Sequence, residues 1–225
     1  MFRAGRAYYA VLPSGGRATE GERSMKILVI GATGTIGAPV AQALETRHEV
    51  IRASRTRSEL KVDLADPESI RHLYAKVGRV DTVVSVAGQA TFRPLLALSD
   101  ADFALCINNK MMGQVNLVRF GADIVADKGS FTLTSGILSR QPMAGGAAIS
   151  MFNSGLEGFV RGAALDLPRG IRINAVAPGW VTETLVAMKM DPAPGTPAAQ
   201  VAQTYVRAVE GGMTGQILDA RGGVG

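Results

Sequence analysis

The chain has 225 residues, a length typical of one domain, and 47% of them are apolar, which is enough for a sizeable core. Its single cysteine excludes an internal disulfide and favours a reducing compartment such as the cytoplasm, and no apolar run is long enough to span a membrane. The formal net charge is +5, and the four arginines and two glutamates of residues 1–24 account for +2 of it. The remaining +3 is too mild to predict a nucleic-acid partner.

Residues 1–24 are rich in Gly, Arg, Ala and Ser and have no periodic apolar face. Their arginines are compatible with a targeting peptide, but Glu20 and Glu22 argue against a transit sequence. A second methionine, Met25, stands just before the first predicted strand. We therefore expect a disordered extension, or upstream sequence translated from an early start codon, followed by a folded domain over residues 25–225.

The first predicted strand leads directly into a glycine-rich turn. Residues 27–30 form an apolar, mostly β-branched run, as in a strand buried on both faces of a parallel sheet. Gly31, Gly34 and Gly37 follow, and apolar residues at helical spacing predict a helix over about 35–46. Such a turn lets the backbone and the helix N-terminus approach a pyrophosphate, which indicates a dinucleotide site. The spacing G-x-x-G-x-x-G is weak by itself, and a plain strand–helix turn is the alternative.

A second strand is predicted over 49–53, and the residues after it indicate which dinucleotide is bound. In NAD-binding units an acidic residue about 20 residues past the glycines binds the ribose 2′-hydroxyl. This chain has Arg52, Ser54, Arg55 and Arg57 there instead. The missing carboxylate and the guanidinium groups favour the extra phosphate of NADP. Arginines in a solvated loop are the alternative interpretation.

Strands and helices continue to alternate along the rest of the chain. Strands are predicted over 60–63, 81–88, 131–135, 171–177 and 216–219, and helices over 66–77, 99–126, 150–167 and from the loop 191–197 to 210. Asp66 and Ser99 are predicted helix N-caps, and Gly78 a helix end. The alternation predicts an α/β fold: one Rossmann-type, doubly wound parallel sheet of about seven strands, with helices on both faces.

From Met25 to its end, the chain resembles a short-chain dehydrogenase/reductase. The resemblance rests on six segments in the expected order: 31–37, 86–88, 134–135, 156–159, 174–179 and 214–218. It implies a homodimer or homotetramer that binds a small carbonyl or alcohol substrate and a nicotinamide cofactor, here NADP (NADPH). Together with the glycine turn and the arginine loop, the cofactor residues implied are Gly31, Thr33, Gly34, Thr35, Ile36, Gly37, Ser54, Arg55, Asp63, Leu64, Ala87, Gly88, Pro178 and Gly179.

The catalytic positions depart from the family pattern. Members of the family use a serine together with a Tyr-x-x-x-Lys pair, in which the tyrosine is the general acid and the lysine lowers its pKa. By resemblance, the tyrosine position falls on Ile149 and the lysine position on Asn153. No tyrosine occurs between residues 74 and 205 and no lysine between 128 and 189, so misalignment cannot restore the pair.

Three residues remain as catalytic candidates. Ser135 stands where the family has its substrate-orienting serine, and Lys110 stands where the family has an asparagine that helps to position the lysine. Lysine at 110 and asparagine at 153 therefore look like an exchange, since the two positions face each other in the family. We take Ser135, Lys110 and Asn153 as the catalytic set, with a surface role for Lys110 as the alternative.

No metal site is predicted. His48 and His72 are expected to be exposed and apart, and Cys106 is expected to pack in the core because no histidine is near it. Two functions remain open. One is an NADP-dependent oxidoreductase with a degenerate active site; the other is an inactive NADP-binding protein that acts as a redox sensor or partner-binding subunit.

Overall fold

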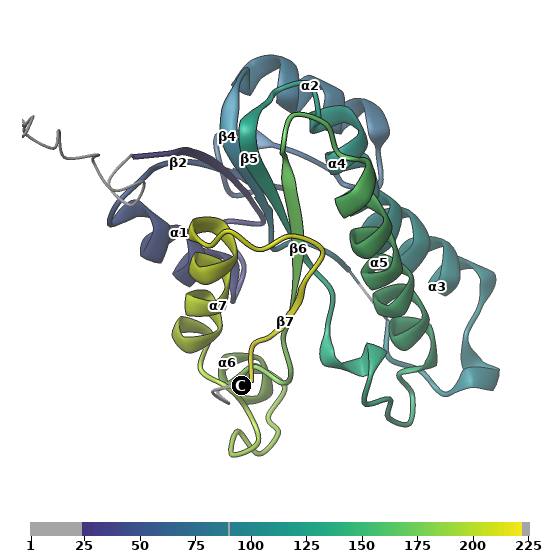
Figure 1. Cartoon of the computed structure of the whole chain (residues 1–225). Helices are drawn as coiled ribbons and strands as arrows, with labels where there is room; N and C mark the ends of the chain where they lie inside the picture. The colour runs from purple at the N-terminus through teal and green to yellow at the C-terminus, as the bar shows by residue number, and fades with distance from the viewer. Residues whose placement is uncertain (1–23, 90, 222–225) are drawn as a thin grey trace, which may run out of the picture.

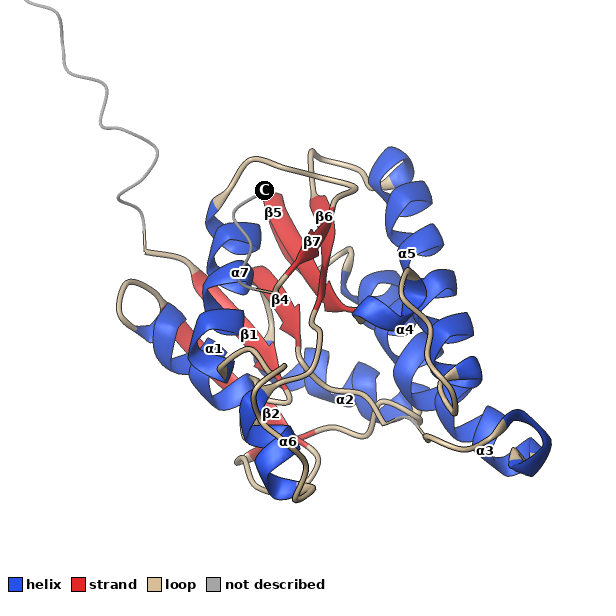
Figure 2. Cartoon of the chain, turned by 90° about the horizontal axis from the view of Figure 1, so that it is seen from below, coloured by secondary structure: helices blue, strands red, loops and turns tan. Residues whose placement is uncertain are grey.

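A computed structural model describes residues 24–89 and 91–221, so nearly all of the predicted extension 1–24 lies outside the described residues. Seven parallel strands form one sheet in the order β3-β2-β1-β4-β5-β6-β7, which confirms the predicted sheet (Figures 1 and 2). The strand order reverses between β1 and β4, and this switch point opens a crevice at the carboxyl ends of the strands. The strands are β1 (Lys26–Ile30), β2 (Glu49–Ser54), β3 (Leu60–Lys61), β4 (Val80–Ser85), β5 (Val125–Thr134), β6 (Arg172–Ala177) and β7 (Ile217–Asp219).

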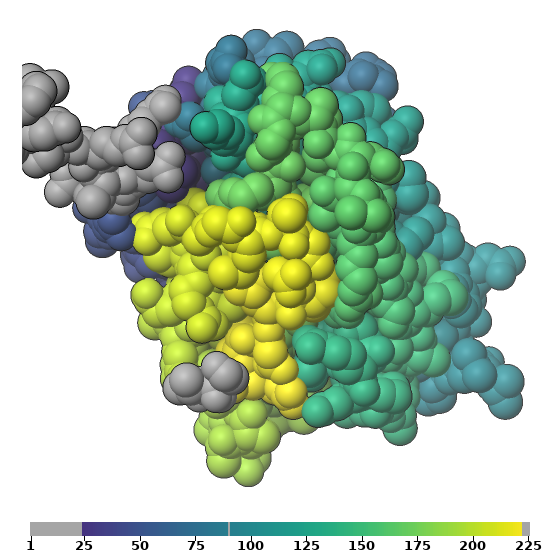
Figure 3. All heavy atoms as spheres, in the orientation of Figure 1, coloured from purple at the N-terminus to yellow at the C-terminus, as the bar shows by residue number. Residues whose placement is uncertain are grey.

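Helices cover both faces of the sheet, as predicted. On one face, α1 (Gly37–Glu45) and α7 (Ala198–Glu210) lie side by side over a core of β1, β4 and β6 residues. On the other, α2 (Pro67–Val77), α4 (Gly113–Gly121) and α5 (Ala147–Asp166) bury a larger apolar cluster. Figure 3 shows that the last described residues, in yellow, pack against green residues that come earlier in the sequence. No helix within the described ranges is long and apolar enough to cross a membrane.

The predicted caps are confirmed. The Asp66 carboxylate accepts a hydrogen bond of 2.9 Å from the Glu68 backbone N–H, which gives this N–H group in the first turn of α2 a partner. Gly78 ends the same helix with a φ of +67°. At the start of α3 (Asp100–Leu105), Ser99 and Asp102 form a reciprocal capping box.

The prediction of one regular helix over 99–126 is wrong. This segment consists of α3, a π-helical segment (Cys106–Met112) and α4, and it ends at Gly121. Strand β5 begins at Val125 rather than at 131, with a register shift against β4 and Lys128 at a φ of 60°. This irregularity interrupts the two-residue period that would have indicated the strand.

The remaining differences are small. β3 has two residues instead of four, and β4 ends at Ser85 instead of 88. The segment after β6 contains a short helix, α6 (Thr182–Ala187), that no pattern predicted. Two 3₁₀ helices, Leu95–Ala97 and Ile137–Ser139, were also not predicted.

Candidate functional site

Two adjoining cavities occupy the crevice at the carboxyl ends of the strands, and both are lined by Val86, Ala87 and Gly88 after β4. The first, about 240 Å³, lies beside the glycine turn and is called the glycine-loop cavity. The second, about 290 Å³, lies beside the end of β5 and is called the Ser135 cavity. Dinucleotides bind in the crevice at the switch point of a doubly wound sheet, where these two adjoining cavities lie.

The glycine turn folds tightly because side chains are excluded from it. Gly31 has a φ of +85°, and a Cβ there would lie 2.9 Å from the backbone of Val86 and Ala87. A Cβ on Gly37 would lie 1.9 Å from the Gly31 carbonyl oxygen. Helix α1 starts here with no side-chain cap and no acidic residue in its first turn. The positive end of its dipole is therefore left without a carboxylate, as a phosphate site requires.

Two arginines line the glycine-loop cavity. The Arg57 guanidinium donates to the Thr33 carbonyl in the glycine turn, and Arg55 donates to Gln89 Oε1 at 3.3 Å. Ser54 Oγ accepts from the backbone N–H of Arg57 and Ser58, which fixes the loop that carries both guanidinium groups. Arg55 also lies 3.8 Å from the Asp63 carboxylate. This side of the cavity therefore holds two cations and one anion.

The prediction that Arg52 belongs with these cations at the cofactor site is wrong. Its side chain donates two hydrogen bonds of 2.7 Å to Glu45 on α1 and does not line the cavity. The other predicted residues are distributed between the two cavities. The glycine-loop cavity is lined by Gly31, Thr33, Gly34, Ser54, Arg55, Asp63 and Leu64. The Ser135 cavity is lined by Ile36, Pro178 and Gly179, and both cavities are lined by Ala87 and Gly88. Thr35 is exposed and Gly37 is buried, and neither lines a cavity.

Lys110, Ser135 and Asn153 all line the Ser135 cavity, although they come from three different elements. Lys110 Nζ donates to the Ser135 carbonyl oxygen at 3.4 Å. The lysine stem packs on Gly88, where a Cβ would lie 3.3 Å from Lys110 Cγ. Burial lowers the pKa of Lys110 to about 8. Lys110 is therefore not a surface lysine, and its ammonium lies beside Ser135 in the cavity that Asn153 also lines.

Two consecutive residues of the π-helical segment line different cavities. Asn109 and Lys110 both lie in its wide turn. Asn109 Oδ1 accepts from the Gln89 N–H at 2.8 Å on the glycine-loop side, whereas Lys110 turns toward Ser135. Single π-helical turns inside α-helices recur at functional sites. Gln114, one turn further on, bonds to the Lys110 carbonyl and to both backbone groups of Thr134, and so joins this segment to the end of β5.

One buried polar atom of the Ser135 cavity has no partner among the described residues. Asn153 Nδ2 donates to the Gly136 carbonyl at 3.3 Å, but Asn153 Oδ1 has no hydrogen bond. The side chain is 2% exposed, so an unsatisfied oxygen costs about 1–3 kcal/mol. An acceptor in this position fits a hydroxyl of a bound ligand.

Most of the remaining lining of the Ser135 cavity is apolar. Phe92 and Trp180 stack with their ring centroids 5.7 Å apart, and Ile149 lies buried on α5. Ile137, Leu138 and Val181 complete this wall. The cavity is thus polar at one end and apolar at the other, a shape suited to a small organic molecule with one oxygen function.

A carboxylate lies buried next to Ser135, but the predicted catalytic set does not include it. Glu157 Oε1 accepts from Ser135 Oγ at 3.1 Å and from Ser139 Oγ at 2.6 Å. The sequence does contain a signal for it, since positions 149, 153 and 157 share one face of a helix. Because glutamate is usually exposed, this spacing was not enough to identify it.

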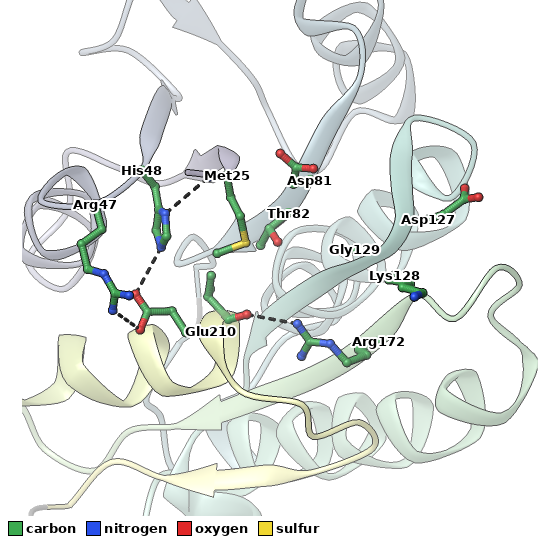
Figure 4. A pocket seen from close by; sticks show the side chains of 11 residues that line it. Met25, Arg47, His48, Asp81, Thr82, Asp127, Lys128, Gly129, Arg172 and Glu210 are labelled. Atoms are coloured by element: carbon green, nitrogen blue, oxygen red, sulfur yellow. Dashed lines mark hydrogen bonds and ion pairs between the residues drawn. The ribbon is translucent and has the colours of Figure 1, made fainter. Parts of the chain in front are cut away.

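A third cavity, about 370 Å³, lies at the opposite, amino ends of the strands and is called the amino-end cavity (Figure 4). Three of its titratable groups bond to one another: Arg47 and His48 both contact Glu210, at 2.9 and 3.2 Å. The Arg172 guanidinium donates to backbone carbonyls at the end of α7, and burial lowers its pKa. The prediction that His48 is exposed is wrong, because its side chain is only 5% exposed.

The described residues contain no cluster of three or more potential metal ligands, and His72 is exposed. Cys106 is a buried free thiol that packs with Ala148 and Phe152, as predicted.

Comparison with known proteins relates this architecture to one family. The profile of the family described as "Enoyl-(Acyl carrier protein) reductase" matches residues 34–224. Hydroxynaphthalene reductase arp2 of Aspergillus fumigatus is 28% identical over 179 residues, covering 76% of this chain and 66% of that protein. The structure of lin1944 from Listeria innocua has a TM-score of 0.84 and 42% identity, covering 87% of this chain and 99% of that one. A small-chain dehydrogenase in complex with NADPH has a TM-score of 0.77 and 27% identity, covering 88% and 96%.

Proposed function

This chain belongs to the short-chain dehydrogenase/reductase family, and we propose that it is an NADP-dependent oxidoreductase that interconverts a small carbonyl compound and its alcohol. The nicotinamide, when bound, accepts or gives up the hydride. The residues of the chain hold the cofactor, orient the substrate and handle the proton. The fungal reductase named above and the dehydrogenase crystallised with NADPH support this assignment.

The glycine-loop cavity supports NADP rather than NAD. The pyrophosphate would lie on the turn formed by Gly31 and Gly34, against the N-terminus of α1. Arg55 and Arg57 reach the side of the cavity where the ribose 2′-phosphate would lie. Guanidinium groups bind phosphate through charge-assisted hydrogen bonds, and no acidic residue occupies the end of β2.

One observation carries the proposal most strongly: the ammonium of Lys110 enters the cavity beside Ser135, although the usual lysine position holds Asn153. Lys110 then supplies the cation near the nicotinamide ribose, and the unpartnered Asn153 Oδ1 accepts a ribose hydroxyl. The exchange of residue types at 110 and 153 keeps one cation and one amide in the same cavity.

A second candidate function, an NADP-binding sensor without hydride chemistry, is favoured by Ile149. Its apolar side chain lines the cavity at the position of the usual general acid and cannot donate a proton. Binding would persist in this case, but turnover would not.

Trp180, the single tryptophan of the chain, lines the Ser135 cavity and allows the two candidates to be separated. NADPH and NADH are titrated while tryptophan emission is recorded, and carbonyl compounds with NADPH and alcohols with NADP⁺ are then screened for turnover. Tight NADPH binding with turnover supports the oxidoreductase. Binding without turnover favours the sensor, and no binding contradicts both.

We also propose assembly as a homodimer or homotetramer. Val118, Phe159 and Leu167 line an open apolar groove between α4 and α5 on the outside of the molecule. A second subunit would cover this groove. A monomeric mass in solution at micromolar concentration would contradict this assembly.

A further inference from the structure

The Glu157 carboxylate is bonded to Ser135, although it does not itself line the Ser135 cavity. It lies on α5, on the helix face that carries Asn153 one turn earlier and Ile149 two turns earlier. Its residue is 3% exposed, and a single carboxylate oxygen accepts from both Ser135 Oγ and Ser139 Oγ. Among the residues lining the cavity, Ser135 alone is bonded to this carboxylate.

Burying a carboxylate costs free energy, and the one ion pair of Glu157 within the described residues offsets little of that cost. Arg161 Nη2 lies 3.5 Å from the second oxygen of Glu157, but its side chain is 57% exposed, so solvent screens the pair. A glutamine would accept the same two serine hydrogen bonds without the cost of burying a charge. The ionisable group therefore points to a role beyond packing.

We propose that Glu157 is a positioning residue that makes Ser135 a proton acceptor, so that the chain oxidises alcohols through a serine–glutamate relay in place of the missing tyrosine. This inference rests on the proposed function. A carboxylate can only accept hydrogen bonds, so the hydroxyl hydrogen of Ser135 points to Glu157. The lone pairs of Ser135 Oγ are then free for the O–H of an alcohol substrate.

The proposed step balances with NADP⁺ as the oxidant. The C–H bond of the alcohol breaks and its electron pair leaves as hydride to NADP⁺, while the O–H bond breaks and the C=O bond forms. The alcohol proton passes to Ser135 Oγ, and the former Ser135 proton passes to Glu157 Oε1. The products are the carbonyl compound, NADPH and a protonated Glu157.

The far side of Glu157 lies toward the protein surface. Its second oxygen is 3.5 Å from Nη2 of Arg161, whose side chain is 57% exposed, so in the proposed relay the proton would leave on this side. The charged groups that face it in the described chain are Arg161 on α5 and, across Ser135, Lys110 on the π-helical segment. Both of these groups are cations.

The test compares Glu157→Gln with Ser139→Ala in alcohol oxidation by the full chain with NADP⁺. Glu157→Gln should lower kcat about 100-fold, leave KM and the NADP⁺ affinity nearly unchanged, and remove the acid limb of the kcat pH profile. Ser139→Ala removes the other donor to the same oxygen but keeps the carboxylate, so its kcat pH profile should keep an acid limb. An unchanged kcat and pH profile in Glu157→Gln would overturn the relay.

A second measurement needs no variant and covers the case in which Glu157→Gln does not fold. Two protons move in the relay, so kcat of the unsubstituted chain in mixtures of H₂O and D₂O should follow a curve rather than a straight line. A straight line overturns the proposal. A chain that binds NADP⁺ but oxidises none of a panel of primary and secondary alcohols also overturns it, while cofactor binding stands; absence of NADP⁺ binding contradicts the proposed function as well.

Discussion

The Ser135 cavity and the amino-end cavity lie at opposite ends of the same strands and differ little in size, at about 290 and 370 Å³. They differ in how their polar groups are satisfied. In the amino-end cavity, Glu210 pairs with Arg47 and His48, and Arg172 bonds to backbone carbonyls. In the Ser135 cavity, Asn153 Oδ1 has no partner among the described residues, and Lys110 has a depressed pKa.

This difference separates a structural cavity from a binding cavity. Polar groups that already bond to one another stabilise the fold and gain little from a ligand. Groups left without partners in an apolar surrounding are costly, and a ligand that completes their hydrogen bonds recovers that cost. Unsatisfied polar groups therefore identify the site better than cavity volume does.

The largest effect is expected from restoring the missing pair in the Ser135 cavity. Ile149→Tyr combined with Asn153→Lys should raise carbonyl reduction with NADPH about 100-fold, because a positioned general acid typically contributes about 10²–10⁴-fold. Ile149→Tyr alone should do less, because a lysine at 153 would lie one helical turn from the phenol, whereas the Lys110 ammonium is bonded to the Ser135 carbonyl. Initial rates of the two variants and the unsubstituted chain decide this. If the single variant equals the double one, Lys110 already supplies that cation.

Lys110→Met should weaken NADPH binding about 10-fold or more, as charge-assisted hydrogen bonds contribute about 1.5–3 kcal/mol. Methionine keeps an apolar stem over Gly88, and Lys76→Met, at an exposed position of α2, is the matched control. Calorimetric titration measures both. Equal affinities in the two variants would show that the Lys110 ammonium does not contact the cofactor.

The same lysine predicts a pH dependence. Its pKa is about 8 in the folded chain and near 10.5 when unfolded, so between these values the unfolded chain binds more protons. The free energy of unfolding of the cofactor-free protein should therefore increase as the pH is raised from about 8 to 10.5. NADPH affinity should fall over the start of that range as the ammonium is lost. Lys110→Met should remove both trends in denaturant titrations and binding isotherms.

Local pattern accounts for what could be predicted from the sequence, and long-range pairing for what could not. The strand, glycine turn and helix over 27–46 follow from periodicity and from glycine conformation, and so do the caps at Asp66 and Ser99. Whether an arginine near β2 faces the cavity depends on Glu45, a residue of a different element that pairs with Arg52. The π-helical turn and the burial of Glu157 likewise depend on packing between elements. Periodicity does not encode such contacts.

The next effect in size is expected on the preference for NADPH over NADH. Arg55→Ala should reduce the preference for NADPH over NADH about 10-fold, because one charge-assisted contact to the 2′-phosphate is lost. Arg52→Ala is the control, since that side chain is bonded to Glu45 and lies outside the cavity. Both cofactors are titrated against each variant. An equal loss in both variants would indicate a general electrostatic effect rather than a phosphate contact.

The smallest effect is expected at the amino-end cavity. Glu210→Gln removes the charge that pairs with Arg47 and His48 but keeps the shape of the side chain. Because the Arg47 side chain is 54% exposed, the free energy of unfolding should fall by only about 0.2–1 kcal/mol, as measured by denaturant titration. NADPH affinity and turnover should not change, since the cavity lies at the far ends of the strands from Lys110 and Ser135. A change in cofactor affinity without loss of stability would mean that the amino-end cavity is coupled to the site, and the contrast between paired and unpaired cavities would no longer separate structure from function.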